Sequence, residues 1–400
     1  MILKLPPDEF AHDPFFKRGP DSEWNACIGS QGDEHNYVDG YMQAALELVE
    51  IVIERESWGQ RDTLVLPMLY NARHAIELVQ KFSARRLLAG GLIRGPVNPH
   101  HQVDALWAML SEAGLGDKVL RETIAALKPF VDSMAAIDED GQELRYHTNI
   151  DDKQSLADRH IVSLEVIRDS LKVLAPLVET LQWRTMKFLD ERETGTCTSR
   201  CSRSDIFTIA RMMPPMDRWK EQAFDDAKVK VRADFGLSSN DFQKVVRIIK
   251  EHPELRALLG AETPLKHLTD DLIIASVKEW RKWHPPRDPN EKKSATASEI
   301  VKEILSEKTN VRGEVISAID QMLTPEQFGE LAALFYLSRD GTYSESFYAQ
   351  ARRWTPEYSV EERPSPEIYQ LFSKTNFLRQ LALSTAQIGR LTLAKTLSTM

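Results

Sequence analysis

The sequence contains little cysteine and no long hydrophobic run. Its three cysteines are Cys27, Cys197 and Cys201. Proteins of a reducing compartment rarely rely on disulfides, so this sparse usage favours the cytoplasm. Cys197 and Cys201 lie in a basic, serine-rich stretch without a second pair of Cys or His at the spacing of a zinc finger. We therefore expect no metal site there.

Signals for secretion, membrane insertion and several enzyme classes are missing as well. The N-terminus, MILKLPPDEF, lacks a basic region followed by an apolar stretch, and no apolar run approaches the roughly 20 residues that cross a bilayer. There is no glycine-rich phosphate loop, GxSxG elbow, HExxH or paired CxxC. We therefore expect a soluble protein without membrane contact, cofactor or metal, and neither ATP hydrolysis nor zinc proteolysis is supported.

Basic residues are outnumbered by acidic ones. The 51 lysines and arginines against 60 aspartates and glutamates give a formal net charge of -9, which argues against a nucleic-acid footprint over the whole surface. A local basic patch is compatible with this balance. The candidate RNA-binding residues, in a stretch where aromatic rings alternate with cations, are Arg200, Arg203, Arg211 and Trp219. The alternative interpretation of this stretch is a solvated helix face.

Apolar residues recur every three or four positions along most of the chain, which predicts an all-α fold. With 400 residues, of which 42% are hydrophobic, the chain can form two or three domains with real cores. We expect an N-terminal antiparallel helical bundle followed by a mostly helical C-terminal half. The expected order is an arm at 1–36, a bundle at 37–190, a linker at 191–205, a helical middle domain at 206–283, a linker at 284–298 and a helical region at 299–400.

The same periodicity predicts the individual helices. They are expected at about 37–58, 62–89, 103–113, 117–137, 157–189, 216–233, 239–259 and 266–283. The polar stretch after Ile137 is the exception, and a short hairpin or strand is expected there around 144–146. Further on, Thr324, Pro325 and Gln327 predict a helix start, with threonine as the N-cap, proline at the first helical position and glutamine at the third.

The helix expected at 62–89 carries a polar cluster in an apolar setting, formed by Arg73, His74, Glu77 and Lys81. Pairs spaced four residues apart, such as Arg73 and Glu77, stabilise a helix by about 0.2–0.5 kcal/mol each. One interpretation is a structural ion-pair network. The other is a functional site in which His74 or Glu77 faces the irregular segment after Ile137. The candidate ligand-binding residues are Arg73, His74, Glu77 and Tyr146.

Three segments of the N-terminal half resemble the HEPN superfamily of helical bundles. They are ARHAIELVQKF at 72–82, HHQVDALWAML at 100–110, and the run LRY at 144–146, and the resemblance spans about 37–189. It implies a bundle of four or five helices, often a homodimer, in proteins that act on RNA or belong to toxin and phage-defence systems. Active members of the superfamily cleave RNA without a metal ion, using an arginine that is followed four to six residues later by a histidine.

The sequence departs from that arginine-histidine motif. His147 follows Arg145 by only two positions, whereas Arg94 with His100 or His101 meets the spacing but precedes the expected third helix. Metal-independent RNA cleavage needs a base, an acid and a cation, roles that suit histidine and arginine. In an extended segment Arg145 and His147 would project to one face; the alternative is a surface or capping contact. The candidate catalytic residues are Arg145, His147 and His101.

These patterns leave three hypotheses open. The first is a cytoplasmic, homodimeric HEPN-like protein associated with RNA, acting as a metal-independent ribonuclease or as a toxin or defence component. The second is a non-catalytic adaptor whose C-terminal helices bind a partner subunit, and the third is a small-molecule sensor that uses the polar cluster as its pocket. The C-terminal aromatic residues are expected to form a core, or a protein interface if exposed: Phe328, Phe335, Tyr336, Tyr343, Phe347 and Tyr348.

Overall fold

The protein is all-α, as its periodicity predicts. The computed structural model describes residues 15–16, 19, 21–97, 101–139, 141–148, 152–286, 297–357 and 366–400. Over these ranges the chain forms sixteen α-helices and four short 3₁₀-helices, with no β-strand beyond an isolated bridge between Thr148 and Gln154. Within the same ranges, no helix combines the length and the apolar character that crossing a membrane requires.

The chain divides into two compact units. The first comprises Met1–Gly114 and Val119–Lys187, and the second comprises Leu115–Lys118 and Phe188–Met400. Each unit has its own buried apolar residues. The two units are therefore described one at a time.

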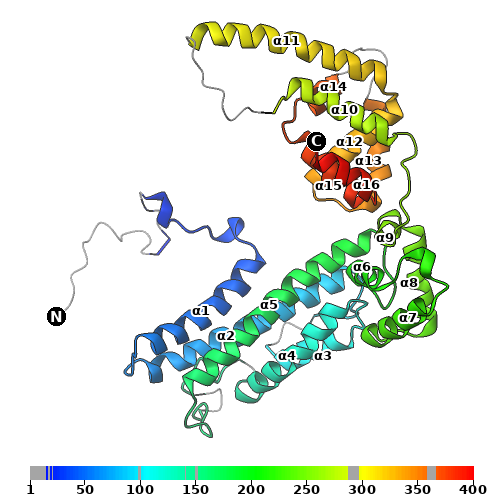
Figure 1. The fold of residues 1–400 in the computed structure, drawn as a ribbon. Helices are drawn as coiled ribbons and strands as arrows, with labels where there is room; N and C mark the ends of the chain where they lie inside the picture. The colour runs from blue at the N-terminus through cyan, green and yellow to red at the C-terminus, as the bar shows by residue number, and fades with distance from the viewer. Residues whose placement is uncertain are drawn as a thin grey trace. The chain divides into compact units, whose positions relative to one another are not determined.

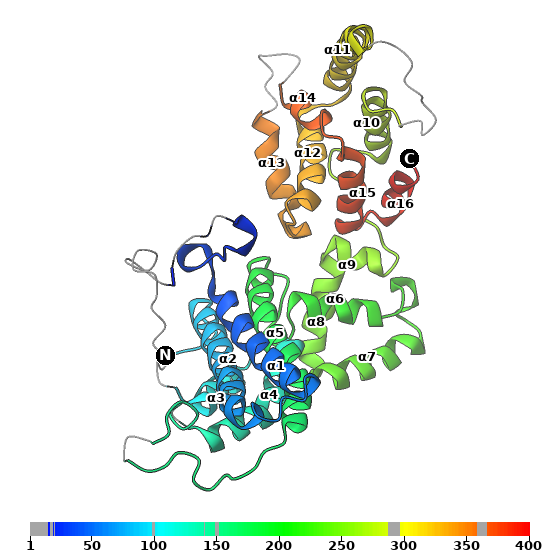
Figure 2. The same ribbon diagram turned by 90° about the vertical axis from the view of Figure 1, so that its left-hand side faces the viewer.

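The first unit is built around five helices, of which α5 belongs to it as far as Lys187. Asp33 starts α1, because its carboxylate accepts a hydrogen bond from the backbone N–H of His35 at 2.7 Å. Helices α1 and α2 pack along each other (Figures 1 and 2) through buried faces that include Val49 of α1 and Ile76 of α2. The bounds are α1 Glu34–Glu54, α2 Arg61–Ala89, α3 Val103–Glu112, α4 Lys118–Ile137 and α5 Leu164–Glu193.

The segment between α4 and α5 differs from expectation. Residues 143–145 form a turn where a strand or hairpin was expected, and α5 begins at Leu164, seven residues later than predicted. The helix starts there because the hydroxyl of Ser163 accepts a hydrogen bond from the backbone N–H of Val166 at 3.4 Å. Earlier in the segment, Leu156 has a left-handed φ of 56°. Its backbone N–H donates to the Glu143 carboxylate at 2.9 Å. Side-chain hydrogen bonding, which periodicity does not report, therefore fixes this polar segment as turns.

The second unit begins with four helices that enclose one apolar core. Pro253 ends α8 and starts α9, because it has no N–H to donate and clashes with the preceding turn. A single helix was expected at 216–233. The extended backbone of Glu221 interrupts it, so that a 3₁₀ turn, η3, precedes α7. The bounds are α6 Arg203–Met212, η3 Met216–Arg218, α7 Gln222–Phe235, α8 Ser239–Glu251 and α9 Pro253–Leu258.

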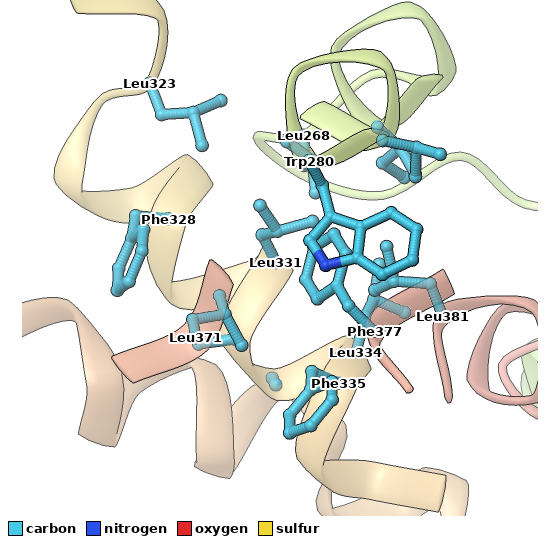
Figure 3. Packing of buried hydrophobic residues seen from close by; sticks show 14 of the residues in the cluster. Leu268, Trp280, Leu323, Phe328, Leu331, Leu334, Phe335, Leu371, Phe377 and Leu381 are labelled. Carbon is cyan, nitrogen blue, oxygen red and sulfur yellow. The ribbon is translucent and has the colours of Figure 1, made fainter. Parts of the chain in front are cut away.

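A second core forms among the last helices of this unit. Phe328 and Phe335 are 1% and 0% exposed (Figure 3). Phe347 is 2% exposed, which confirms that these three aromatic residues build a core. The predicted start at Thr324 is also confirmed, since Thr324 and Gln327 make both hydrogen bonds of a capping box. The bounds are α10 Asp270–Trp283, α11 Ala297–Met322, α12 Pro325–Arg339, η4 Ser344–Ser346, α13 Phe347–Glu357, α14 Pro366–Phe372, α15 Phe377–Gln387 and α16 Leu391–Ser398.

Helices α12 and α13 approach closely at Gly329, which generates a stability prediction. A Cβ added there would lie 2.6 Å from the Ala351 carbonyl oxygen and 2.4 Å from the Thr355 hydroxyl. Gly329→Ala should therefore lower the free energy of unfolding by about 1–3 kcal/mol. Gly313 of α11 is the matched control, because a Cβ there meets nothing within 4 Å.

Gly313→Ala should raise the free energy of unfolding by about 0.5–1 kcal/mol, since glycine is a weak helix former. Urea denaturation followed by circular dichroism measures both variants. Equal stability of Gly329→Ala and the unmodified protein would contradict the close packing of α12 on α13.

Candidate functional site

Two residues of the polar cluster on α2 are buried and paired with each other. Arg73 and Glu77 are 1% and 2% exposed, and the Arg73 Nη1 atom lies 3.1 Å from Glu77 Oε2. The spacing of four residues places both side chains on one face of the helix. The ion pair expected from the sequence is thus present in the structure.

Arg73 also holds two distant segments against α2. Its Nε donates to the carbonyl of Asp138 at 2.9 Å, and its Nη2 donates to the carbonyl of His101 at 2.7 Å. A buried guanidinium is tolerated only where its donors and its charge are matched in this way. Gly141 belongs to the same arrangement: its φ is 80°, and a Cβ there would lie 3.1 Å from Arg73 Nη1. A side chain at position 141 would therefore displace the guanidinium.

Asp138 connects Arg73 to the turn after α4. Its carboxylate is fully buried and lies 3.5 Å from Arg73 Nε. It accepts backbone hydrogen bonds from Glu143 at 3.0 Å and from Leu144 at 3.4 Å. The turn that precedes Arg145 is therefore tied to the buried arginine of α2.

Glu77 uses its second oxygen to hold His101. Oε1 lies 2.9 Å from Nδ1 of His101 and 2.7 Å from Nζ of Lys81. Burial alone would raise the pKa of Glu77, but the hydrogen bonds and charges of Lys81 and His101 outweigh it and lower this pKa. An ionised carboxylate accepts only, so Nδ1 of the imidazole donates to it, and in the neutral ring Nε2 is the acceptor.

His101 therefore differs from a packed core histidine. Its side chain is 49% exposed, while the carboxylate that holds it is 2% exposed. A nitrogen base that is fixed on one side and open to solvent on the other has the arrangement of a general base with its orienting group. Both residues are candidates from the sequence, but in different groups, because they lie 24 positions apart.

The segment after the turn presents a cation and an aromatic ring beside this cluster. Arg145 is exposed, and its Nε donates to the carbonyl of Gly141. Its guanidinium carbon lies 5.9 Å from the ring centre of Tyr70 and 5.5 Å from that of Tyr146, which is 54% exposed. His147 is exposed as well, and its carbonyl accepts a hydrogen bond from Ser155 at 2.9 Å.

His74 lies in an aromatic environment. Its ring stacks on Tyr70 at 5.6 Å and meets the Tyr41 ring edge-on at 4.5 Å. Burial lowers the pKa of His74, so the neutral imidazole is favoured. Its described ring contacts are with these tyrosines, which gives it a packing role beside the cluster.

Arg203, predicted to contact RNA, lies inside the second unit. It is 12% exposed on its side chain and pairs with Glu345, Nε to Oε1 at 2.8 Å, and with Glu254, Nη2 to Oε2 at 3.0 Å. The rings of Phe207 and Tyr343 lie 4.2 and 4.7 Å from its guanidinium carbon. The basic stretch thus supplies an internal ion pair at this position.

The other predicted RNA contacts differ in their exposure to solvent. Arg200 and Arg211 are exposed, and Arg211 lies 5.9 Å from the Phe207 ring. Trp219 is half-buried, with its indole N–H donating to the carbonyl of Pro214 at 2.9 Å. His100, the alternative to His101, lies outside the described residues. Within the described part of the chain, no group of three or more His, Cys, Asp or Glu residues is placed to hold a metal ion.

Known proteins offer no template for these residues. No family model matches the chain, and neither does a curated protein or a solved structure. A function can therefore be inferred only from the side-chain geometry within each unit.

The Arg73 network generates a second stability prediction. Arg73→Met leaves the buried Asp138 carboxylate without its cation and Glu77 with Lys81 alone, and should lower the free energy of unfolding by about 3–5 kcal/mol. Arg85→Met is the control on the same helix, because Arg85 forms an exposed ion pair with Glu34 and should cost less than about 1 kcal/mol. Urea denaturation compares the two, and similar losses would contradict a special role for Arg73.

Proposed function

We propose that the first unit cleaves RNA without a metal ion, with His101 as the general base, Glu77 as its positioning residue and Arg145 as the cation that contacts phosphate. The observation that carries the proposal is the half-exposed imidazole of His101 held at 2.9 Å by a buried carboxylate. A fixed imidazole with a free nitrogen is suited to take a proton near neutral pH.

The proposed reaction uses the RNA 2′-hydroxyl as its nucleophile. Nε2 of His101 takes the hydroxyl proton, the 2′-oxygen forms a bond to the adjacent phosphorus, and the bond to the 5′-oxygen breaks. A proton must then reach the leaving 5′-oxygen, and His147 is our candidate for the acid. The products are a 2′,3′-cyclic phosphate and a free 5′-hydroxyl, so the atoms and the proton balance.

Charges and rings on the segments that the Arg73 network joins support RNA as the substrate class. The Arg145 guanidinium remains charged and suits the phosphate oxygens, on which negative charge grows in the transition state. Lys81 adds a second positive charge beside Glu77. The exposed ring of Tyr146 lies next to Arg145, where an unpaired base could stack on it.

The HEPN resemblance gives the proposal its biological setting. The segments at 72–82, 100–110 and 144–146 carry that resemblance, and they include Glu77, His101 and Arg145. A cytoplasmic, homodimeric protein of the toxin or defence type, with an N-terminal antiparallel bundle, is part of the same proposal. The pairing of His101 with Glu77 also offers a base that does not depend on the arginine-histidine spacing from which this sequence departs.

A non-catalytic adaptor is the second candidate function. The observation that favours it is the short spacing between Arg145 and His147. The apolar residues Phe377, Leu381 and Leu397 of the C-terminal helices are fully buried within their own unit, so an adaptor would have to use other surfaces. An RNA cleavage assay separates the two candidates.

Substitution of His101 tests the proposed ribonuclease. Purified protein is incubated with total RNA in the presence of a chelator, and cleavage products are quantified over time. His101→Ala should lower the rate by about 10²–10⁴-fold, the usual contribution of a general base, and Arg145→Ala should also lower it. His160→Ala, at an exposed histidine of the same unit, is the control and should keep the rate.

The outcomes decide between the candidates. Intact RNA with the unmodified protein would leave the adaptor as the better candidate. Equal rates for His101→Ala and His160→Ala would remove His101 from the chemistry, because any cleavage would then come from elsewhere.

A further inference from the structure

A pocket of about 470 Å³ lies in the second unit, apart from the residues proposed to cleave RNA. It is bordered by the chain after α5, the junction of α8 and α9, the segment before α10, and η4. Small-molecule sites have volumes of about 300–1,000 Å³ and combine apolar walls with a few polar groups. This pocket has both features.

The apolar wall comes from three segments that are distant in the sequence. Leu265, Phe347 and Ile388 line the pocket, and Phe347 and Ile388 belong to the core of the C-terminal helices. Their side chains are held by packing and present a rigid apolar surface. A hydrocarbon or aromatic group fits against such a surface.

The polar side of the pocket is acidic. Glu251, Glu254 and Glu345 line it, and no lysine or arginine is among the described residues of its lining. Glu345 and Glu254 share the single guanidinium of Arg203, which lies behind them. Three carboxylates in the lining, of which Glu254 and Glu345 pair with one arginine, leave the pocket with negative charge, which favours a cation over an anion.

The pKa values of Glu254 and Glu345 are shifted in opposite directions. Burial raises the pKa of Glu254. Burial acts in the same direction on Glu345, but hydrogen bonds from His252 and Arg203 outweigh it and lower the pKa of that carboxyl. Glu345 is therefore the ionised partner of Arg203, and Glu254 is the carboxylate whose charge a ligand cation would stabilise.

Two buried polar atoms in the pocket have no partner. His252 is 10% exposed on its side chain and places Nε2 at 3.1 Å from Glu345 Oε1, while its Nδ1 has no hydrogen-bond partner in the described part of the chain. The hydroxyl of Thr263, another lining residue, is unpartnered among the same residues. Buried polar atoms are nearly always hydrogen-bonded, so these two unpaired atoms indicate that a bound group supplies the missing hydrogen bonds.

The tautomer of His252 indicates what the missing group must supply. Where the neutral ring donates Nε2–H to the Glu345 carboxylate, Nδ1 is an acceptor. Pro253 contributes to this placement, because the residue before a proline is driven into an extended conformation, and His252 has φ -92° and ψ 117°. A group that donates a hydrogen bond satisfies Nδ1 in this tautomer.

We infer that this pocket binds a small organic amine, with its ammonium group between Glu254 and Nδ1 of His252 and its apolar body against Leu265, Phe347 and Ile388. An ammonium group has three donors and no acceptor, which matches the acceptors on the polar side. The hydroxyl of Thr263 can accept a further hydrogen bond.

Calorimetric titration of the full-length protein tests the inference with two matched probes. 2-Phenylethylamine and phenylacetate carry similar apolar bodies and opposite charges. The amine should bind with saturation at one site, and phenylacetate should bind at least about tenfold more weakly, because it loses the charge-assisted hydrogen bonds. Equal binding of the two probes, or no saturable binding of the amine, overturns the inference.

Variants place the binding in the pocket. Glu254→Gln keeps the shape of the side chain and should weaken amine binding about tenfold or more, whereas Glu279→Gln, whose ion pair with Lys282 lies outside the pocket lining, should leave it unchanged. Circular dichroism checks that each variant is folded. Unchanged affinity in a folded Glu254→Gln protein overturns the inference.

Thr263→Val provides a second variant that does not touch the Arg203 ion pairs. It removes an unpartnered buried hydroxyl, so the thermal stability should be equal or higher while the amine binds more weakly. If Glu254→Gln fails to fold, the amine affinity of Thr263→Val tests whether the amine binds in this pocket. Amine affinity as tight in Thr263→Val as in the unmodified protein then counts against the assigned pocket.

Discussion

The buried guanidinium of Arg73 is the interaction on which the first unit depends. Its ion pair with Glu77 is local, but its bonds to Asp138 and His101 join α2 to two segments far along the chain. Because an unmatched charge in this position is costly, the chain before α3 and the turn after α4 must stay where they complete it. Gly141 gives the guanidinium the room that any side chain would take.

The chemistry proposed for the first unit follows from this constraint. With one oxygen of Glu77 bound to Arg73, the other is left to Lys81 and His101. The imidazole is thereby held from the protein side and open on the other. A buried arginine plays a similar part in the second unit. Arg203 packs against carboxylates and rings and holds two carboxylates on the acidic side of a pocket.

The sequence predicted what depends on neighbouring residues and little of what depends on distant ones. Periodicity located most helices, and a spacing of four residues predicted the pair of Arg73 and Glu77. The partners of Glu77 and Arg203 in other segments lie 24 to 142 positions away, and no local pattern reports such contacts. Arg203 was assigned to an RNA-binding stretch from its basic neighbours, whereas its burial follows from tertiary packing. The hydrogen bond from Leu156 to the Glu143 carboxylate is likewise invisible to periodicity, and α5 begins seven residues after its predicted start.

The tautomer of the His101 imidazole reports directly whether Glu77 fixes its orientation. Long-range ¹H–¹⁵N spectra of histidine-labelled protein, with the signal assigned by loss in His101→Ala, distinguish the two neutral tautomers. We predict the Nδ1–H form in the unmodified protein, because Nδ1 donates to the carboxylate. Glu77→Gln should abolish that preference. An Nε2–H tautomer, or a spectrum that Glu77→Gln leaves unchanged, would contradict the account.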